Sequence, residues 1–451
     1  MNLIHVAGTK GKGSTSSFIS SILAQYLPTA KSVHAERLPT SVGLYTSPHL
    51  RFVRERIQID GRPISEQQFA KYFWEVWDRL GATSPANEEH EARNVSGKPV
   101  YFHYLTLMAL HCYMQEKVGT AVIECGIGGE YDTTNILEKP LTTGVTSLGI
   151  DHVAMLGDTI ESIAWHKAGI FKPGVPAFTV PQPEQALAVL HERALQTGTE
   201  LRVVDEHPAL AHMRLGLQGD FQRINASLAI AICVSHLSRL GYIAANSTFD
   251  RVSDLPEEFV RGLETVHLGG RCETRQDASL NGLTWYIDGG HTLESIEMAG
   301  RWFATATTGK QGALRVLIFN QQTRDAPALA RRLHTTLASA LKDDRPFQHA
   351  IFCTNTTYKG AGYKADLVSM NTSKDDVDSL RVQRDLAHAY DEIDPEAKVH
   401  VLGTIEEAVV RARELADGKT AEVLVTGSLH LAGGLTEVLE SETERAQDSR
   451  S

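Results

Sequence analysis

A glycine- and lysine-rich segment near the first residue carries the most chemistry in this chain. The segment GTKGKGS, residues 8–14, directly follows an apolar run at 3–7 that predicts a short buried strand. A strand, a Gly-Lys loop and a helix form a phosphate-binding loop, because backbone N–H groups at the helix N-terminus cradle phosphate oxygens. Lys12 would add a point charge on the β- and γ-phosphates. The segment therefore predicts a nucleoside triphosphate site.

The spacing of this loop departs from the common pattern Gly-x-x-x-x-Gly-Lys-Ser/Thr. The chain has Val6 where that pattern needs glycine and Gly13 where it needs a hydroxyl, and Ser14 and Thr15 follow one residue late. The variant resembles the loop of Mur-type ATP-dependent amide ligases. A glycine-rich turn that binds nothing is the alternative, but two lysines and three glycines within six positions disfavour it.

Charged residues follow two later strands of the first half. Glu124 ends an apolar run at 118–123, and Asp151 and His152 follow a run at 143–148. Ligands of open parallel sheets sit outside the carboxyl ends of strands, so we expect these side chains near the phosphate loop. A carboxylate and an imidazole beside a triphosphate indicate magnesium, although magnesium prefers oxygen ligands. The alternatives are a surface carboxylate and a hydrogen-bonded pocket histidine.

Lys167 occupies an unusual position in a predicted helix. The segment 158–168 starts with a capping pattern, Asp158 followed by Glu161 three positions on. Its apolar residues recur at helical spacing, and Lys167 falls on the same inward stripe. A lysine there is costly unless it is paired, neutral or modified. The alternative is a side chain that snorkels to solvent.

Three further segments offer polar groups. Residues 46–48 (TSP) predict a loop, followed by an arginine-rich strand with Arg51, Arg54 and Arg56 that could hold carboxylates or form an exposed charged edge. In the second half, DGGH (288–291) and GSLH (427–430) each close a strand and open a helix. Each places a polar side chain and free backbone N–H groups at the carboxyl end of a strand, or is an ordinary turn.

Strands and helices alternate through both halves of the chain. Apolar strand patterns lie at 3–7, 118–123, 143–148, 175–180, 201–204, 284–287, 314–319, 350–353, 399–402 and 422–426, and helical patterns at 13–26, 101–117 and 222–240. This alternation predicts two parallel α/β domains. We expect an N-terminal P-loop ATPase domain with a mainly parallel sheet at 1–270 and a C-terminal Rossmann-like domain at 271–451. The polar stretches 360–395 and 440–451 are predicted to be mobile.

Composition bounds the class of protein. The chain has 451 residues, a net charge of −11 and 42% hydrophobic residues, which suits a globular protein with more than one core. The acidic balance argues against non-specific nucleic-acid binding and against an anionic membrane surface. No apolar run is long enough to span a bilayer. Five cysteines without a C-x-x-C pair indicate a reducing compartment, so we expect a cytoplasmic protein.

Eight motifs resemble the folylpolyglutamate synthase family of the eukaryotic, fungal type, within the Mur ligase superfamily. They run in order from residue 3 to about 436: HVAGTKGKGST (5–15), YTSPHLRFVRERI (45–57), ECGIGGEYDTTN (124–135), SLGIDHVAMLGDT (147–159), AWHKAGIFK (164–172), GGRCE (269–273), WYIDGGHT (285–292) and VLVTGSLHLAGG (423–434). The resemblance implies a Mur-ligase-like fold. It also implies ATP-dependent addition of L-glutamate to the γ-carboxylate of a folate through an acyl phosphate.

The resemblance also implies roles for single residues. It assigns the nucleotide to Gly8, Thr9, Gly11, Lys12, Gly13, Ser14, Thr15, Asn225, Arg271 and Asp288, and the metal to Ser14, Ser47, Glu124 and His152. It assigns the substrates to Tyr45, Ser47, Pro48, Arg51, Ser428 and His430, and the catalytic roles to Lys12, His152, Lys167 and His291. Lys167 matches the lysine that is carbamylated in this superfamily, and a carbamate would turn the inward cation into an anion.

The same resemblance implies the partners. ATP, a reduced folate and L-glutamate are the expected substrates, with Mg²⁺ at two sites and room for a monovalent cation. A monomer is expected. The upstream helical segment typical of the family is missing, and a mitochondrial form would require an upstream targeting segment. The chain also departs from the family at Phe221, where histidine is common, and at 28–40, which is longer than the usual link.

Four other functions fit part of the pattern. Dihydrofolate synthase uses the same machinery on dihydropteroate, and the motifs do not separate it cleanly. A Mur-type ligase acting on a cell-wall precursor is disfavoured by the serine-proline loop. A dinucleotide-binding oxidoreductase would need glycine at position 16, where Ser16 stands, and leaves Lys12 unexplained. A non-catalytic nucleotide-binding module should lack Glu124, His152 and Lys167 together.

Overall fold

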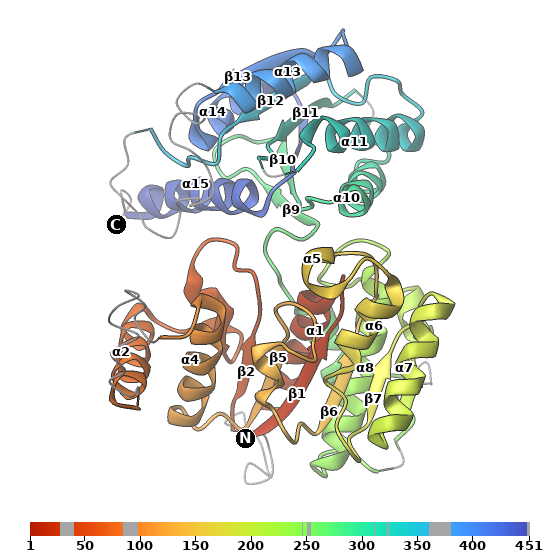
Figure 1. Cartoon of the computed structure of the whole chain (residues 1–451). Coiled ribbons are helices and arrows are strands. Elements are labelled where there is room, and N and C mark those ends of the chain that lie inside the picture. Colours follow the sequence, from red (N-terminus) through yellow and green to blue (C-terminus); the bar gives the residue numbers. More distant parts are fainter. Residues whose placement is uncertain are drawn as a thin grey trace. The chain divides into compact units, whose positions relative to one another are not determined.

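A computed structural model describes residues 1–27, 40–83, 98–245, 247–249, 254–310, 312–322, 324–359 and 380–448. These residues form two compact units (Figure 1). Unit 1 comprises Met1–His49, Arg54–Gly216 and Phe221–His267, and unit 2 comprises Leu50–Val53, Leu217–Asp220 and Leu268–Ser451. The predicted insertion at 28–40 lies outside the described residues except for Thr40. Each unit is an α/β fold, which confirms the predicted fold class.

The sheet of unit 1 has eight strands in the order β4-β3-β2-β5-β1-β6-β7-β8. Their bounds are β1 Asn2–Ala7, β2 Val42–Tyr45, β3 Ile57–Ile59, β4 Arg62–Pro63, β5 Thr120–Glu124, β6 Thr142–Val145, β7 Ala177–Thr179 and β8 Leu201–Val203. All neighbours from β2 to β8 are parallel, and β3 and β4 are antiparallel additions at one edge. Val6 of the central strand pairs with Glu124 of β5 and Gly144 of β6. The phosphate loop, Glu124 and the segment after β6 therefore share one edge of the sheet.

Helices cover both faces of this sheet. They are α1 Lys12–Ala24, α2 Glu66–Thr83, α4 Tyr101–Gln115, α5 Val153–Leu156, α6 Ile160–Ala168, α7 Glu184–Thr197, α8 Gln222–Arg239 and α9 Glu257–Thr265. α1 packs against α8 and α9, whereas α6 packs against α7. Ala7, Cys125 and Val145 form a buried core with residues of α6 and α7. Because these helices bury both faces, the strands read as continuous apolar runs rather than as alternating patterns.

The sheet of unit 2 has six strands in the order β13-β12-β11-β14-β10-β9. Their bounds are β9 Glu273–Gln276, β10 Leu283–Ile287, β11 Leu314–Phe319, β12 His349–Cys353, β13 Lys398–Leu402 and β14 Ala421–Thr426. The helices are α10 Leu293–Ala306, α11 Ala326–Leu341, α13 Arg381–Ile393, α14 Ile405–Ala416 and α15 Leu429–Asp448. Only β9 is antiparallel among these strands. α14 and α15 cover one face and share its core (Figure 1).

Three sequence-based expectations about local structure are wrong. The arginine-rich strand is a 3₁₀ helix, Val53–Arg56, because pairing with β2 begins only where the apolar residues return at Ile57. Thr159, not Asp158, caps α6, since its side chain accepts the Ser162 N–H. Of the two segments predicted to be mobile, 381–393 is the helix α13 and 440–448 belongs to the helix α15. The buried residues of α13, Gln383, Leu386 and Tyr390, recur at helical spacing beneath a charged outer face.

In the described part of the chain, no helix is both long enough and apolar enough to cross a membrane.

A buried ion pair in unit 2 yields a prediction about stability. The Asp277 carboxylate accepts hydrogen bonds from Trp285 Nε1 at 2.8 Å and from Arg413 at 2.9 and 3.0 Å, and its side chain is fully buried. Arg413 also pairs with Glu442 at 2.7 Å, so removing Asp277 leaves the buried Trp285 N–H without its acceptor and takes one of two carboxylates from Arg413. Asp277→Ala should therefore lower the free energy of unfolding of unit 2, measured in urea titrations, by about 1–3 kcal/mol for each buried donor that loses its acceptor. Glu297→Ala, which removes an exposed ion pair with Arg301, should lower the free energy of unfolding by about 1 kcal/mol or less. Equal losses in the two variants would contradict the greater importance of the buried carboxylate.

Candidate functional site

The phosphate loop of unit 1 depends on two glycines that allow close backbone approach. Gly8 has a φ of 148° and Gly11 a φ of 86°. A Cβ atom on Gly8 would lie 1.8 Å from Thr146 Oγ1, and one on Gly11 would lie 2.2 Å from Asn225 Oδ1. Only glycine fits at these positions. The loop is also tied to the strand end beside it, because the N–H groups of residues 9 and 10 both donate to Ser147 O at 3.0 Å.

Two lysines converge on this loop. Lys12 Nζ and Lys167 Nζ each donate to the carbonyl oxygen of Gly8, and both distances are 2.9 Å. Lys12 begins α1, whereas Lys167 comes from α6 and is 3% exposed, so its side chain does not snorkel to solvent. Two ammonium groups on one carbonyl repel each other and favour an anion as ligand. A glycine cradle with two cations suits a polyphosphate.

The surroundings of Lys167 alter its protonation. Burial, and then the positive charge of Lys12, lower its pKa from 10.5 to about 7. Near neutral pH the amine is therefore uncharged in a substantial fraction of molecules. A neutral amine is the form that can react with carbon dioxide to give a carbamate.

The lowered pKa of Lys167 predicts how stability depends on pH. Between pH 7 and 10.5 the amine is neutral in the folded chain and charged in the unfolded chain, so unfolding takes up a proton. The contribution of this residue makes the free energy of unfolding of unit 1 rise with pH across that window, and Lys167→Met should remove the rise. Urea unfolding of both variants at several pH values, in carbonate-free buffer, measures the difference. Identical pH profiles would contradict a lowered pKa.

Glu124 anchors the serine-proline loop at the end of β5. Its side chain is 2% exposed, and its Oε2 atom accepts a hydrogen bond from the backbone N–H of Ser47 at 3.1 Å. The Ser47 side chain is half-buried and Pro48 is exposed. The carboxylate is therefore in contact with the backbone of Ser47, and the metal role of both residues stays a prediction.

Ser14 meets a second helix in the first turn of α1. Gln222 Nε2 donates to Ser14 Oγ at 3.2 Å, and Asn225 Nδ2 donates to Gln222 Oε1 at 2.9 Å. Gln222 was missed by the sequence analysis, although it lies three residues before Asn225 and so on the same face of α8. The predicted nucleotide residue Asn225 therefore lies against the phosphate loop, as its contact with Gly11 also shows.

His152 lies at the start of α5 in an exposed position. It adopts a left-handed backbone conformation with a φ of 52°, and its N–H donates to Asp151 Oδ1 at 2.9 Å. Asp151 Oδ2 is 3.7 Å from Lys10 Nζ. The segment after β6 is thereby connected to the phosphate loop, which is the neighbourhood that the strand-end rule predicts.

The donor set suits magnesium rather than a transition metal. Within the described ranges, no three or more His, Cys, Asp or Glu side chains group to hold an ion. Glu124 and the hydroxyls of Ser14 and Ser47 are oxygen donors from three strand ends or turns. Magnesium is commonly held by one or two carboxylates, with water and substrate phosphates completing its shell. The residues present therefore fit Mg²⁺ bound together with a nucleotide.

The predicted substrate residues differ in their placement. Tyr45 is fully buried, its hydroxyl lies 3.1 Å from Thr106 Oγ1, and burial raises its pKa to about 12. Arg51 contacts Glu440 and lies 3.5 Å from Glu437 of α15, within unit 2. The contacts of Tyr45 and Arg51 with a substrate stay predictions.

Unit 2 gathers polar groups at the carboxyl ends of β10 and β14. Asp288 accepts hydrogen bonds from the N–H groups of Cys272 at 2.9 Å and Gly290 at 2.8 Å, and burial raises its pKa while Arg271 opposes the rise. His291 Nδ1 lies 3.0 Å from Gly289 O. Ser428 Oγ accepts from the N–H groups of residues 430 and 431, so it caps α15, and burial lowers the pKa of His430.

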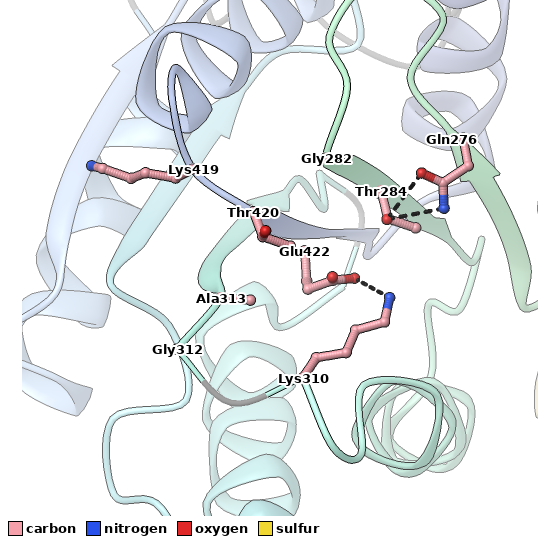
Figure 2. A pocket seen from close by; sticks show the side chains of 9 residues that line it. All are labelled: Gln276, Gly282, Thr284, Lys310, Gly312, Ala313, Lys419, Thr420 and Glu422. Atoms are coloured by element: carbon pink, nitrogen blue, oxygen red, sulfur yellow. Dashed lines mark hydrogen bonds and ion pairs between the residues drawn. The ribbon is translucent and has the colours of Figure 1, made fainter.

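A pocket of about 530 Å³ lies at the opposite edge of the same sheet (Figure 2). Its lining includes Lys310 and Glu422, whose charged atoms are 2.9 Å apart, and the hydrogen-bonded pair Gln276 and Thr284. Lys310 Nζ also donates to Tyr286 OH at 2.7 Å. These polar groups satisfy one another, and the pocket lies at the amino ends of the strands. It is therefore a poor candidate for the functional site.

Curated relatives match almost the whole chain. A folylpolyglutamate synthase of Neurospora crassa is 45% identical over 447 residues, which cover 98% of this chain and 81% of the relative. A folylpolyglutamate synthase of Saccharomyces cerevisiae (strain FostersO) is 46% identical over 442 residues, covering 98% of this chain and 77% of the relative. A scan of protein-family models gave no match.

Solved structures share the fold. Folylpolyglutamate synthase from Mycobacterium tuberculosis, complexed with ADP and AMPPCP, superposes with a TM-score of 0.69 at 23% identity, over 97% of this chain and 91% of that one. The enzyme from Thermotoga maritima gives 0.69 at 23% identity, over 98% and 89%. An FPGS-AMPPCP-folate complex gives 0.66 at 23% identity, over 97% and 90%. At these identities the superpositions establish the fold.

Proposed function

The chain belongs to the folylpolyglutamate synthase family, and from that premise we propose that it uses ATP to add L-glutamate to the γ-carboxylate of a folate. The geometry that carries the proposal is the convergence of Lys12 and Lys167 on the Gly8 carbonyl, behind a glycine cradle. Structures of the same fold were solved with ADP, AMPPCP and folate, which correspond to a product, an ATP analogue and the acceptor of this reaction. The family match favours this function over dihydrofolate synthase.

The reaction follows from charge and connectivity. A carboxylate oxygen of the folate attacks the γ-phosphorus of ATP, ADP leaves, and an acyl phosphate forms. The amine of L-glutamate then attacks the acyl carbon, phosphate leaves and the nitrogen loses a proton, so that one amide bond replaces one phosphoanhydride bond. Lys12 would neutralise charge on the transferred phosphoryl group, which matters because positioning and electrostatics dominate phosphoryl transfer.

The metal assignment completes this arrangement. Ser14, Ser47 and Glu124 would hold one Mg²⁺, and Glu124 with His152 a second. When bound, the ion would supply further positive charge beside the phosphates. The Glu124–Ser47 contact supports the first set, because it brings a carboxylate to the backbone of the residue that shares its ligand role.

Carbamylation of Lys167 is supported by its pKa of about 7. The neutral amine would attack carbon dioxide and lose a proton, giving a carbamate with one negative charge. That negative charge would lie beside Lys12, whose positive charge disfavours the protonated form of the unmodified Lys167 amine. The carbamate would then orient Lys12 and the metal rather than react with substrate.

The remaining assignments rest on the resemblance. Arg271 and Asp288 are proposed to serve the nucleotide, His291 to act beside them in catalysis, and Ser428 and His430 to serve the substrates, supported by their place at carboxyl ends in unit 2. Pro48 and Arg51 are proposed to help seat the folate. ADP as product, a monovalent cation, a monomeric state and a cytoplasmic location are proposed on the same basis.

The test is ATP- and Mg²⁺-dependent incorporation of labelled L-glutamate, with tetrahydrofolate and dihydropteroate offered in parallel. Incorporation into tetrahydrofolate, lost on omission of either ATP or Mg²⁺, is the expected result. Incorporation only into dihydropteroate would replace the proposal with dihydrofolate synthase. Incorporation into neither acceptor by folded protein would overturn the acceptor assignment.

A further inference from the structure

The first turns of α1 and α8 meet through a buried glutamine. α1 packs along α8, and Gln222, the first residue of α8, is fully buried. A side-chain amide taken out of water costs about 1–3 kcal/mol unless its hydrogen bonds are replaced. Gln222 therefore needs hydrogen-bond partners. Its two partners are Ser14 and Asn225, which are assigned to the metal and the nucleotide.

The hydrogen bonds of Gln222 run to two points of the site. Its Nε2 atom donates to Ser14 Oγ at 3.2 Å, and its Oε1 atom accepts from Asn225 Nδ2 at 2.9 Å. The other end of the Asn225 amide abuts Gly11, where a Cβ atom would lie 2.2 Å from Oδ1. Gln222 and Asn225 thus link Gly11, the left-handed residue just before α1, to the hydroxyl of Ser14.

The direction of the first bond restricts the Ser14 hydroxyl. A serine oxygen has one proton and two lone pairs, and its O–H can rotate among staggered positions. A donor N–H at one lone pair keeps the proton from pointing toward Gln222. The proton and the second lone pair must then point elsewhere, and Ser14, which is 7% exposed, has little other freedom. The amide therefore fixes which way the hydroxyl oxygen offers its remaining lone pair.

We propose that Gln222 is a positioning residue for the metal. Its hydrogen bond would orient the Ser14 hydroxyl so that one lone pair is free for Mg²⁺. Asn225 would in turn hold the Gln222 side chain so that its N–H points at Ser14. This inference rests on the proposed function, because it takes Ser14 as a ligand of the nucleotide-bound ion. Partners of this kind typically contribute 10–100-fold to metal affinity or activity.

The test separates metal-dependent binding from folding. Binding of a non-hydrolysable ATP analogue is measured by calorimetry with Mg²⁺ and without it, in the wild-type chain and in Gln222→Met. Methionine keeps the volume and removes both hydrogen bonds. We expect the gain in affinity that Mg²⁺ gives to fall about 10–100-fold, while Mg²⁺-free binding changes by less than about threefold.

Ser227→Ala is the matched control. Ser227 is a buried residue of α8 whose hydroxyl donates to Arg223 O at 2.7 Å and accepts from the His207 N–H at 2.8 Å. Its replacement should lower the thermal midpoint and leave the Mg²⁺-dependent gain unchanged. A similar loss of that gain in both variants would mean that Gln222 acts only through packing, which would overturn the proposal.

Ser14→Ala distinguishes the two ways of failing. If Ser14→Ala leaves the Mg²⁺-dependent gain intact, the metal assignment of Ser14 is wrong and the inference falls with it. If Ser14→Ala lowers the gain and Gln222→Met does not, the positioning role alone is wrong. The double variant should lose no more than Ser14→Ala, because both changes act on one interaction. Gln222→Asn, which cannot reach Ser14, carries the same expectation should the methionine variant not fold.

Discussion

Replacing Lys167 with alanine should lower kcat for glutamate incorporation by about 10²–10³-fold or more, the scale at which preorganised electrostatic groups act. Lys167 is buried and shares the Gly8 carbonyl with Lys12. Without it, Lys12 would keep its hydrogen bond to the Gly8 carbonyl but lose the second amine beside it and, after carbamylation, its charge partner. Unit 1 should remain folded, since the change removes an amine that is costly to charge in a buried position.

The measurement compares kcat and the thermal midpoint of Lys167→Ala with those of Lys139→Ala, which removes an exposed lysine of the same unit. Only the first variant should lose activity, and neither should unfold. Small carboxylic acids such as formate should restore part of its rate if the lost group is a carbamate. Wild-type rates in Lys167→Ala would contradict the catalytic assignment, and a loss without any rescue would favour a role for the amine itself.

Glu124→Gln should lower kcat by about 100-fold or more and raise the concentration of Mg²⁺ needed for half-maximal rate. Loss of an outer partner of a metal ligand already costs 10–100-fold, so loss of a ligand charge should cost at least as much. Glutamine keeps an oxygen that can accept the Ser47 N–H, so the serine-proline loop should stay in place. The change therefore removes the negative charge of Glu124 without removing the hydrogen bond that holds the serine-proline loop.

Rates measured over a range of Mg²⁺ concentrations check this expectation. Glu138→Gln is the control, because it neutralises an exposed carboxylate of the same unit. A lower kcat with an unchanged Mg²⁺ requirement would place Glu124 in the catalytic machinery but away from the ion. Unchanged kinetics in both respects would remove it from the site.

Local signals explain why much of the fold and part of the site could be predicted. The run 3–7, the glycines after it and the periodicity of the next helix lie within a few residues of one another, and they became β1, the loop and α1. The inward position of Lys167 followed from helical spacing alone, and its 3% exposure agrees. Glu124 was found because strand ends in a parallel sheet share an edge.

Contacts between distant segments could not be predicted in this way. Gln222 and Ser14 are 208 residues apart, and no spacing rule connects them. The cap of α6 at Thr159 depended on which of two adjacent polar side chains turns toward the helix. The helix α13 was missed because its charged outer face dominates its composition, although its few apolar residues keep helical spacing.

The most direct test is transfer of oxygen from folate to phosphate. Tetrahydrofolate carrying ¹⁸O in its γ-carboxylate is incubated with the chain, ATP, Mg²⁺ and L-glutamate, and the released phosphate is analysed by mass spectrometry. Attack of the carboxylate on the γ-phosphorus predicts one ¹⁸O atom in phosphate for each amide bond formed. Amide formation with unlabelled phosphate, or with the label in AMP, would contradict activation as an acyl phosphate at the phosphate loop.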